Sequence, residues 1–363
     1  MVNVAILGFG TVGSGVAEVL EKNGAHIGQK VSTPVCLKYI LDVRDFPDSP
    51  FADKVIHDFR IIEEDPTVDI VVETIGGATV ALDFTRRALN AGKSVVSSNK
   101  ELVAEHGYEL IQLAAQKGVS YLFEASVGGG IPILRPLSQC LAANELTEVC
   151  GILNGTTNYI LTRMIRGGLS FEAALKEAQE KGYAEQDPTA DIEGHDACRK
   201  IKLLGRAIRE PDGRICAYVA PHLVDEESPL AGVEDVFNGI VVKGDAIGDV
   251  MFYGRGAGKL PTASAVVADV MDAARHIQSR KRMEWGPGGD DVTVSPDHLV
   301  FRWYVRAEGE PETVRSSLPH AELLTAPGAA EGEVAFLTPE MTRAQAEAAA
   351  KGLKVRSLFR VLE

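Results

Sequence analysis

The chain has 363 residues, more than one ordinary domain needs, so we expect at least two domains with cores of their own. Its formal net charge of −14 argues against nucleic acid or an anionic membrane surface as a partner. Five cysteines without C-x-x-C spacing, no apolar run long enough to cross a membrane and no leader-like N-terminus together predict a cytoplasmic protein with reduced thiols.

The first residues of the chain predict a site for a dinucleotide. Residues 2–7 form a short apolar run typical of a buried parallel strand, and a helical pattern begins a few residues later. Between them stands GFGTVG (8–13), a G-x-G-x-x-G motif in the strand–turn–helix context that it requires. Such a turn lets the backbone approach a pyrophosphate at the N-terminus of the helix. The residues expected to bind it are Gly8, Gly10, Thr11, Val12 and Gly13.

The second predicted strand, residues 35–41, ends where the adenosine ribose of a dinucleotide should lie. Asp42 and Arg44 follow it. An acidic residue at this point usually accepts a hydrogen bond from the 2′-hydroxyl of NAD, whereas an arginine accommodates the 2′-phosphate of NADP. Because both residues are present, this segment by itself leaves the two cofactors open.

Strands and helices then alternate as in a doubly wound sheet. The predicted strands are 69–77, 94–97 and 120–124, and the predicted helices are 82–91 and 101–117. Ligands bind beyond the carboxyl ends of the strands in such sheets. The residues expected on that rim are Thr74, Ile75, Ser98, Asn99, Lys100 and Glu124. Lys100 directly follows a strand and is a candidate catalytic lysine, although an exposed loop lysine would look the same.

The middle of the chain contains the most unusual stretch, AQEKGYAEQDPTADIEGHDACRK (178–200). The apolar pattern predicts helices over 158–167, 170–181 and 194–208. On the last of these, Asp196 and Lys200 would lie one turn apart on the same face, with Glu185 and Asp191 in the irregular segment before it. Carboxylates around a lysine suit an ammonium-bearing substrate and proton transfer. A solvated loop with one ion pair would show the same pattern.

The last part of the chain begins with a second glycine-rich loop, residues 254–258, and a predicted helix over 261–277. After residue 298 the pattern predicts the order strand, helix, strand, strand, helix, strand. These elements are expected at 299–306, 311–317, 322–325, 333–337, 342–351 and 355–362. This βαββαβ order is typical of ferredoxin-like modules.

Several of these segments together resemble the homoserine dehydrogenases. The resemblance is carried by GFGTVGSG (8–15), ETIGG (73–77), SSNKELVAEHG (97–107), EASVGGGIPI (124–133), GILNGTTNYIL (151–161), the 178–200 stretch and GRGAGKLPTASAVVAD (254–269). Within 178–200 the family signature is matched at Ala178, Gly182, Tyr183, Asp187, Pro188, Asp191, Gly194, Asp196 and Lys200. The resemblance covers roughly residues 1–285. It implies interconversion of L-aspartate 4-semialdehyde and L-homoserine with NAD(P)H, a step toward threonine, methionine and isoleucine.

The resemblance also implies roles for individual residues. Lys200 and Lys100 would form the catalytic pair, with Asp196 orienting Lys200. The substrate would be bound by Glu185, Asp191, Tyr183, Thr156 and Gly155. The cofactor, NADP by a slight preference for Arg44 over Asp42 and with NAD also accepted, would further contact Thr74, Ile75, Ser98, Lys100, Gly256 and Gly258. A monovalent cation, usually sodium, would be held by the side chain of Glu124 and the carbonyls of Val127, Gly129 and Ile131.

The expected fold is α/β: a Rossmann-type doubly wound sheet, an α+β substrate and dimerisation domain, and a short C-terminal ferredoxin-like, ACT-like module. The resemblance places them at 1–130 completed by 254–290, at 131–253 and at 298–363, in a homodimer or higher homo-oligomer. The glycine-containing turn usual in ACT modules is replaced by AEGEP (307–311), which leaves effector binding open.

Two alternative functions are a different semialdehyde or hydroxy-acid dehydrogenase on this scaffold and a non-catalytic dinucleotide sensor. An acyl-transferring semialdehyde dehydrogenase would need a cysteine nucleophile in a strand-to-helix turn, and none of the five cysteines lies in one. A sensor would not need Lys100, Lys200 and their surrounding carboxylates.

Overall fold

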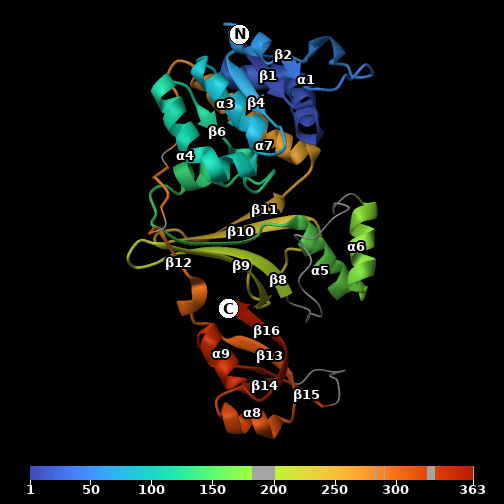
Figure 1. Ribbon diagram of the computed structural model, residues 1–363, viewed down its shortest axis with the longest axis vertical. Helices are drawn as coiled ribbons and strands as arrows, with labels where there is room; N and C mark the ends of the chain where they lie inside the picture. The colour runs from blue at the N-terminus through green and yellow to red at the C-terminus, as the bar shows by residue number, and fades with distance from the viewer. Residues whose placement is uncertain (182–200, 282, 284, 290, 325–331, 363) are drawn as a thin grey trace. The chain divides into compact units, whose positions relative to one another are not determined.

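The computed structural model describes residues 1–181, 201–281, 283, 285–289, 291–324 and 332–362 (Figure 1). The chain forms two compact units, each described here by itself. Unit 1 comprises Met1–Ala143 and Gly254–Gly288, and unit 2 comprises Asn144–Tyr253 and Gly289–Glu363. Among the described residues, every helix is too short or too polar to cross a membrane.

Unit 1 is built on a six-stranded parallel sheet of order β3-β2-β1-β4-β5-β6, the order of a Rossmann fold. Its strands are β1 (Val2–Leu7), β2 (Val35–Leu41), β3 (Val55–Ile56), β4 (Ile70–Glu73), β5 (Ser94–Ser97) and β6 (Tyr121–Leu122). The predicted doubly wound sheet is therefore confirmed. The central strands are buried on both faces because helices cover each side.

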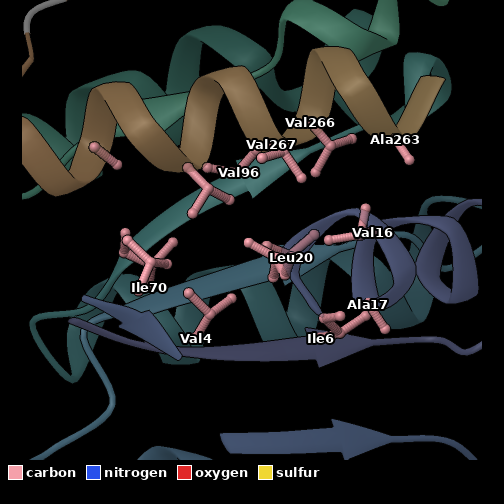
Figure 2. Close-up of a cluster of buried hydrophobic side chains, with 14 of the residues drawn as sticks. Val4, Ile6, Val16, Ala17, Leu20, Ile70, Val96, Ala263, Val266 and Val267 are labelled. Atoms are coloured by element: carbon pink, nitrogen blue, oxygen red, sulfur yellow. The ribbon is translucent and has the colours of Figure 1, made fainter. Parts of the chain in front are cut away.

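Side chains of alternate strand residues enter two cores on the two faces of this sheet. The helices are α1 (Thr11–Val31), α2 (Arg60–Glu64), α3 (Thr79–Asn90), α4 (Lys100–Lys117) and α7 (Lys259–Arg275). Val4 and Ile6 pack with α1 and α7 on one face, as Figure 2 shows, whereas Ala5 and Leu7 pack with α2, α3 and α4 on the other. The late segment that carries α7 thus belongs to the core of unit 1.

Unit 2 contains a long mixed sheet of order β11-β10-β7-β8-β9-β16-β13-β15-β14, with β12 paired to β9. Its first strands are β7 (Leu146–Ile152), β8 (Ile201–Arg209), β9 (Ile215–Val224), β10 (Phe237–Gly244), β11 (Gly248–Arg255) and β12 (Thr293–Val294). Helix α5 (Gly155–Gly167) packs against β8 and β10, and α6 (Phe171–Glu180) packs against α5 (Figure 1).

The prediction of a helix over 194–208 is wrong for its described part, because residues 201–209 form β8. The apolar residues of this segment fit a helical period as well as a strand. Tertiary pairing decides the outcome: β8 pairs antiparallel with β9 from Ile201 to Arg209 and with β7 on its other edge. Residues 194–200 lie outside the described residues, so the predicted helical spacing of Asp196 and Lys200 stays untested.

The C-terminal part of unit 2 has the predicted βαββαβ order. Its elements are β13 (Trp303–Glu308), α8 (Pro311–Ser317), β14 (Glu322–Leu324), β15 (Glu333–Leu337), α9 (Arg343–Ala349) and β16 (Lys354–Leu362). Antiparallel pairing gives the strand order β16-β13-β15-β14. The end of β16 also pairs in parallel with β9, from Arg360 opposite His222 to Leu362 opposite Val224, so this part continues the sheet of unit 2.

Candidate functional site

The glycine-rich loop between β1 and α1 has the geometry that a pyrophosphate requires. Gly8 has a φ of +87°, which favours glycine. A Cβ on Gly13 would lie 1.9 Å from the carbonyl oxygen of Gly8, so any side chain there would force α1 away from β1. At Gly10 a Cβ would have no atom within 4 Å, and this residue caps α1 without a side-chain hydrogen bond. The first turn of α1 can therefore receive an anion at close range.

Thr74, predicted to contact the cofactor, fastens this loop to the sheet. Its hydroxyl lies 2.9 Å from the carbonyl oxygens of both Leu7 and Gly8, and its N–H donates to Leu7 at 2.9 Å. The structure therefore brings Gly8, Gly13 and Thr74 together, as the rim prediction requires.

Asp42 and Arg44, the two candidates for reading the adenosine ribose, bind each other. The Arg44 side chain donates to Asp42 through Nε at 3.0 Å and Nη2 at 3.2 Å, and the N–H of Phe9 donates to Asp42 Oδ2 at 2.7 Å. Burial alone would raise the pKa of Asp42, but the hydrogen bonds from Arg44 and Phe9 outweigh it and lower this pKa to about 2. The Arg44 side chain is 61% exposed and its guanidinium lies over the Phe46 ring. Both charges are thus present next to the glycine loop.

Lys100 opens helix α4 at the end of β5 and is exposed. The preceding residue, Asn99, caps the helix by accepting a hydrogen bond from the N–H of Leu102 at 3.0 Å. The amide nitrogen of Asn99 also donates to the carbonyl oxygens of Ile75 at 3.0 Å and Gly77 at 2.8 Å. Asn99 therefore ties Lys100 to the loop after β4, which contains another predicted cofactor residue.

Glu73 was not among the predicted site residues, yet its buried carboxyl group lies at the centre of this rim. It closes β4 and is fully buried. The sequence signal for it is one acidic residue at the end of an otherwise apolar strand, Ile70–Glu73, whose hydrogen-bond partners the sequence does not reveal.

Glu124, the predicted side-chain ligand of a cation, is engaged by the backbone. Its carboxylate accepts hydrogen bonds from the N–H groups of Ile133 at 2.5 Å, Leu134 at 2.8 Å and Arg135 at 2.8 Å. About four lone-pair directions exist on a carboxylate, so roughly one remains for a further ligand. The glycine turn that follows is tight: a Cβ on Gly129 would lie 1.9 Å from the carbonyl oxygen of Gly256.

The remaining lone-pair direction of Glu124 and the carbonyl oxygens of Val127, Gly129 and Ile131 have the donor chemistry that a hard cation prefers. Among the described residues, no three histidine, cysteine or acidic side chains cluster as metal ligands. Gly256 contacts this turn, and Gly258 caps α7 with a φ of +120°.

In unit 2, Gly155 and Thr156 form the first turn of α5. Asn154 caps this helix by accepting from the N–H of Thr157 at 2.9 Å. A Cβ on Gly155 would lie 3.0 Å from the carbonyl oxygen of Val236, so the glycine permits close packing. The remaining predicted site residues, Tyr183, Glu185, Asp191, Asp196 and Lys200, lie outside the described residues.

Comparisons with known proteins agree across the chain. A family model described as "Homoserine dehydrogenase, NAD binding domain" matches residues 8–124, and one described as "Homoserine dehydrogenase" matches 132–213 and 200–271. The homoserine dehydrogenase of Bacillus subtilis (strain 168) is 37% identical over 321 residues, covering 76% of this chain and 74% of that protein.

Solved structures extend the likeness. A homoserine dehydrogenase from Thiobacillus denitrificans matches with a TM-score of 0.85 and 30% identity, covering 100% of this chain and 98% of that one. A hyperthermophilic archaeal homoserine dehydrogenase in complex with NADPH matches with a TM-score of 0.65 and 26% identity, covering 75% of this chain and 97% of that one.

Proposed function

Since this chain belongs to the homoserine dehydrogenase family of NAD(P)-dependent oxidoreductases, we propose which of its residues bind the cofactor, bind the substrate and transfer the proton in the interconversion of L-aspartate 4-semialdehyde and L-homoserine. In the reductive direction an aldehyde carbon receives a hydride and its oxygen receives a proton. A bound nicotinamide dinucleotide supplies or accepts the hydride. The enzyme's own residues then have to bind the amino-acid substrate in the orientation that hydride transfer requires and deliver the proton.

In this proposal unit 1 binds the dinucleotide. Support comes from the glycine loop, because the open space at Gly10 and the close approach at Gly13 are what a bound pyrophosphate needs. Thr74, Ile75 and Ser98 would contact the nicotinamide half from the ends of β4 and β5, and Gly256 and Gly258 would close on it from the loop before α7.

We assign NADP as the preferred cofactor, with NAD also accepted. The exposed guanidinium of Arg44 could pair with a 2′-phosphate, although Asp42 already holds it. The likeness to the archaeal structure that contains NADPH points the same way. The same Asp42 carboxylate could accept from the 2′-hydroxyl of NAD once Arg44 has turned to solvent.

In this proposal, Lys100 at the carboxyl end of β5 and residues of the 178–200 stretch transfer the proton and bind the amino-acid part of the substrate. Lys200 and Lys100 would protonate the developing alkoxide and stabilise its charge, with Asp196 orienting Lys200. Glu185 and Asp191 would bind the ammonium group, assisted by Tyr183. The first turn of α5, at Gly155 and Thr156, would bind the substrate carboxylate, since the N-terminus of a helix attracts anions.

A monovalent cation, usually sodium, would be held by the side chain of Glu124 and the carbonyl groups of Val127, Gly129 and Ile131. Its contribution would be to fix the glycine turn. We further propose a homodimer or higher homo-oligomer formed through residues 131–253, and an ACT-like identity for residues 298–363, supported by the order β16-β13-β15-β14.

One assay tests this function directly. Initial rates of homoserine oxidation would be measured with NAD and NADP in turn, and of aspartate semialdehyde reduction with NADH and NADPH. We expect activity with both dinucleotides and a lower KM for the phosphorylated one. Dinucleotide binding without turnover of either substrate would instead favour a sensor.

A further inference from the structure

Glu73 occupies a position where a carboxyl group is costly unless it is hydrogen-bonded. It ends β4 between Leu7 of β1 and Ser97 of β5, and its residue is 0% exposed. Removing an acidic group from water without partners costs several kcal/mol in typical cases. A role for the carboxyl group must therefore be sought in the hydrogen bonds that it makes.

Both carboxyl oxygens of Glu73 are used, and each bonds to a different turn. One oxygen accepts from the N–H of Ile75 at 2.7 Å, in the loop after β4. The other lies 2.5 Å from the hydroxyl of Ser97, the last residue of β5. The Ser97 hydroxyl in turn accepts from the N–H of Asn99 at 3.1 Å.

Asn99 closes the ring of contacts by donating back to the carbonyl oxygens of Ile75 and Gly77 and by capping α4. The loop after β4 and the turn after β5 are thus linked twice, once through Glu73 and once through Asn99. The first turn of α4 begins at Lys100, the residue after Asn99. Every contact in this ring lies within unit 1.

We propose that Glu73 is a positioning residue, whose carboxyl group sets Lys100 and the Ile75 loop in the one arrangement that hydride and proton transfer require. The proposal rests on the catalytic role proposed for Lys100. Both oxygens are needed, because one accepts from the Ile75 N–H and the other bonds to the Ser97 hydroxyl. Glutamine could keep both contacts by donating from its NH₂ group to that hydroxyl, as a protonated carboxyl group can, whereas leucine removes both oxygens and breaks the two links.

Burial raises the pKa of Glu73 to about 7, against the lowering effect of its bonds to Ser97 and Ile75. In either protonation state the group can keep a hydrogen bond to Ser97, because a protonated oxygen can donate to the hydroxyl. The link between the two turns therefore persists across neutral pH.

The test is a double-mutant cycle on the full enzyme with Glu73→Leu, Lys100→Ala and the combination. We expect Glu73→Leu to lower kcat about 10–100-fold, the loss typical of a small misplacement of a catalytic group. The combined variant should be no slower than Lys100→Ala alone, because the two residues act through one group. Glu73→Asp, which keeps both acceptors on a shorter stem, should recover part of the rate.

A matched control separates positioning from stability. Lys93 is also buried in unit 1, and its ammonium group donates to the carbonyl oxygens of Asp65 at 2.6 Å and Val68 at 3.2 Å. It precedes β5 and so lies at the amino ends of the parallel strands, whereas Glu73 lies at their carboxyl ends. Lys93→Met should lower the melting temperature and leave kcat within about two-fold when assayed well below melting. If Glu73→Leu fails to fold, Ser97→Ala removes the link between Glu73 and Ser97 and takes its place in the cycle.

Each outcome decides one point. Wild-type kcat in Glu73→Leu, or losses that multiply in the combined variant, would overturn the positioning role while leaving Lys100 catalytic. Wild-type kcat in Lys100→Ala would remove Lys100 from the mechanism and the proposal with it. Losses in both single variants that fail to multiply would support the role of Glu73.

Discussion

At the scale of single residues, the pairing of Asp42 with Arg44 determines what the adenosine end of the cofactor meets. Arg44→Ala should weaken NADP binding by about 1–3 kcal/mol, the range for hydrogen bonds to charged groups, and leave NAD binding nearly unchanged. Dissociation constants for the two dinucleotides, from fluorescence or calorimetric titration, measure this difference. Equal losses for both would show that Arg44 does not contact the phosphate.

The chain contains a matched control for this change. Arg60 bonds to Asp58 two residues before it, through both its N–H and its side chain, as Arg44 bonds to Asp42. Arg60→Ala also removes one positive charge from unit 1, but this charge is not next to the glycine loop. We expect it to leave both dissociation constants unchanged, so that a general effect of net charge can be separated from contact with the phosphate.

Glu73 also gives the stability of the protein a pH dependence of known sign. Burial raises the pKa of this carboxyl group from 4.5 to about 7, so between these values the folded state holds a proton that the unfolded state has released. Stability should therefore fall as the pH rises from about 4.5 to 7, by up to roughly 3 kcal/mol. Tyr121, the titratable neighbour on β6, stays neutral because burial raises its own pKa further.

Melting temperatures of the wild type and Glu73→Gln between pH 5 and 8 check this expectation. The variant should lose less stability than the wild type over that interval. The variant is compared with the wild type, because other buried acids such as Asp269 contribute to the pH dependence of stability in both proteins. Parallel curves would mean that Glu73 does not titrate in this interval.

At the scale of elements, the two glycines of the first loop should respond differently to a methyl group. Gly13→Ala would place a Cβ 1.9 Å from the Gly8 carbonyl oxygen, so we expect a lower melting temperature and loss of dinucleotide binding. Gly10→Ala meets no atom within 4 Å and has an ordinary φ of −78°, so the fold should tolerate it. Its KM for the dinucleotide should nevertheless rise, because the methyl group occupies the approach of the pyrophosphate. An unchanged KM would move the pyrophosphate away from Gly10.

Sequence patterns predicted most of unit 1 because these elements are local: the buried strands are short and largely apolar, and helices α1, α3 and α4 each follow a strand within a few residues. Residues 201–209 were mispredicted because their partners, at 146–152 and 215–224, are distant or ambiguous in the pattern. For the same reason, the sequence does not reveal the role of Glu73. Its chemistry depends on Ser97 and Asn99, about 25 residues away, which only the sheet brings beside it.

The candidate site was predictable in part for the same reason. The glycine loop follows from a contiguous motif and Thr74 from the end of a buried strand, and the structure brings them together. The pairing of Asp42 with Arg44 could not be predicted, because the motif does not say which charge faces the ligand. The three backbone N–H groups that bind Glu124 come from residues 133–135, and the pattern around the glycine turn did not predict these contacts.

At the scale of the whole chain, residues 299–363 are joined to the rest of unit 2 by strand pairing and ring contacts as well as by the chain itself. β16 pairs with β9, and the guanidinium of Arg360 lies 5.0 Å from the centre of the Tyr218 ring, 5.1 Å from Trp303 and 5.5 Å from Phe301. Burial lowers the pKa of Arg360. Cation–π contacts of a partly desolvated arginine are worth about 1–2 kcal/mol in typical cases.

Removing residues 299–363 should therefore damage unit 2 rather than release an independent appendage. The deletion leaves the β9 edge at 222–224 without its partner strand and uncovers His222, which is fully buried in the intact chain. An exposed edge next to uncovered rings favours aggregation. We expect a lower melting temperature and loss of soluble enzyme, followed by circular dichroism and size-exclusion chromatography. Arg360→Ala, which keeps the strand, should show a smaller loss of stability. A truncated enzyme with the melting temperature and kcat of the full chain would mean that the pairing of β16 with β9 contributes little, and that this part can dock and separate freely.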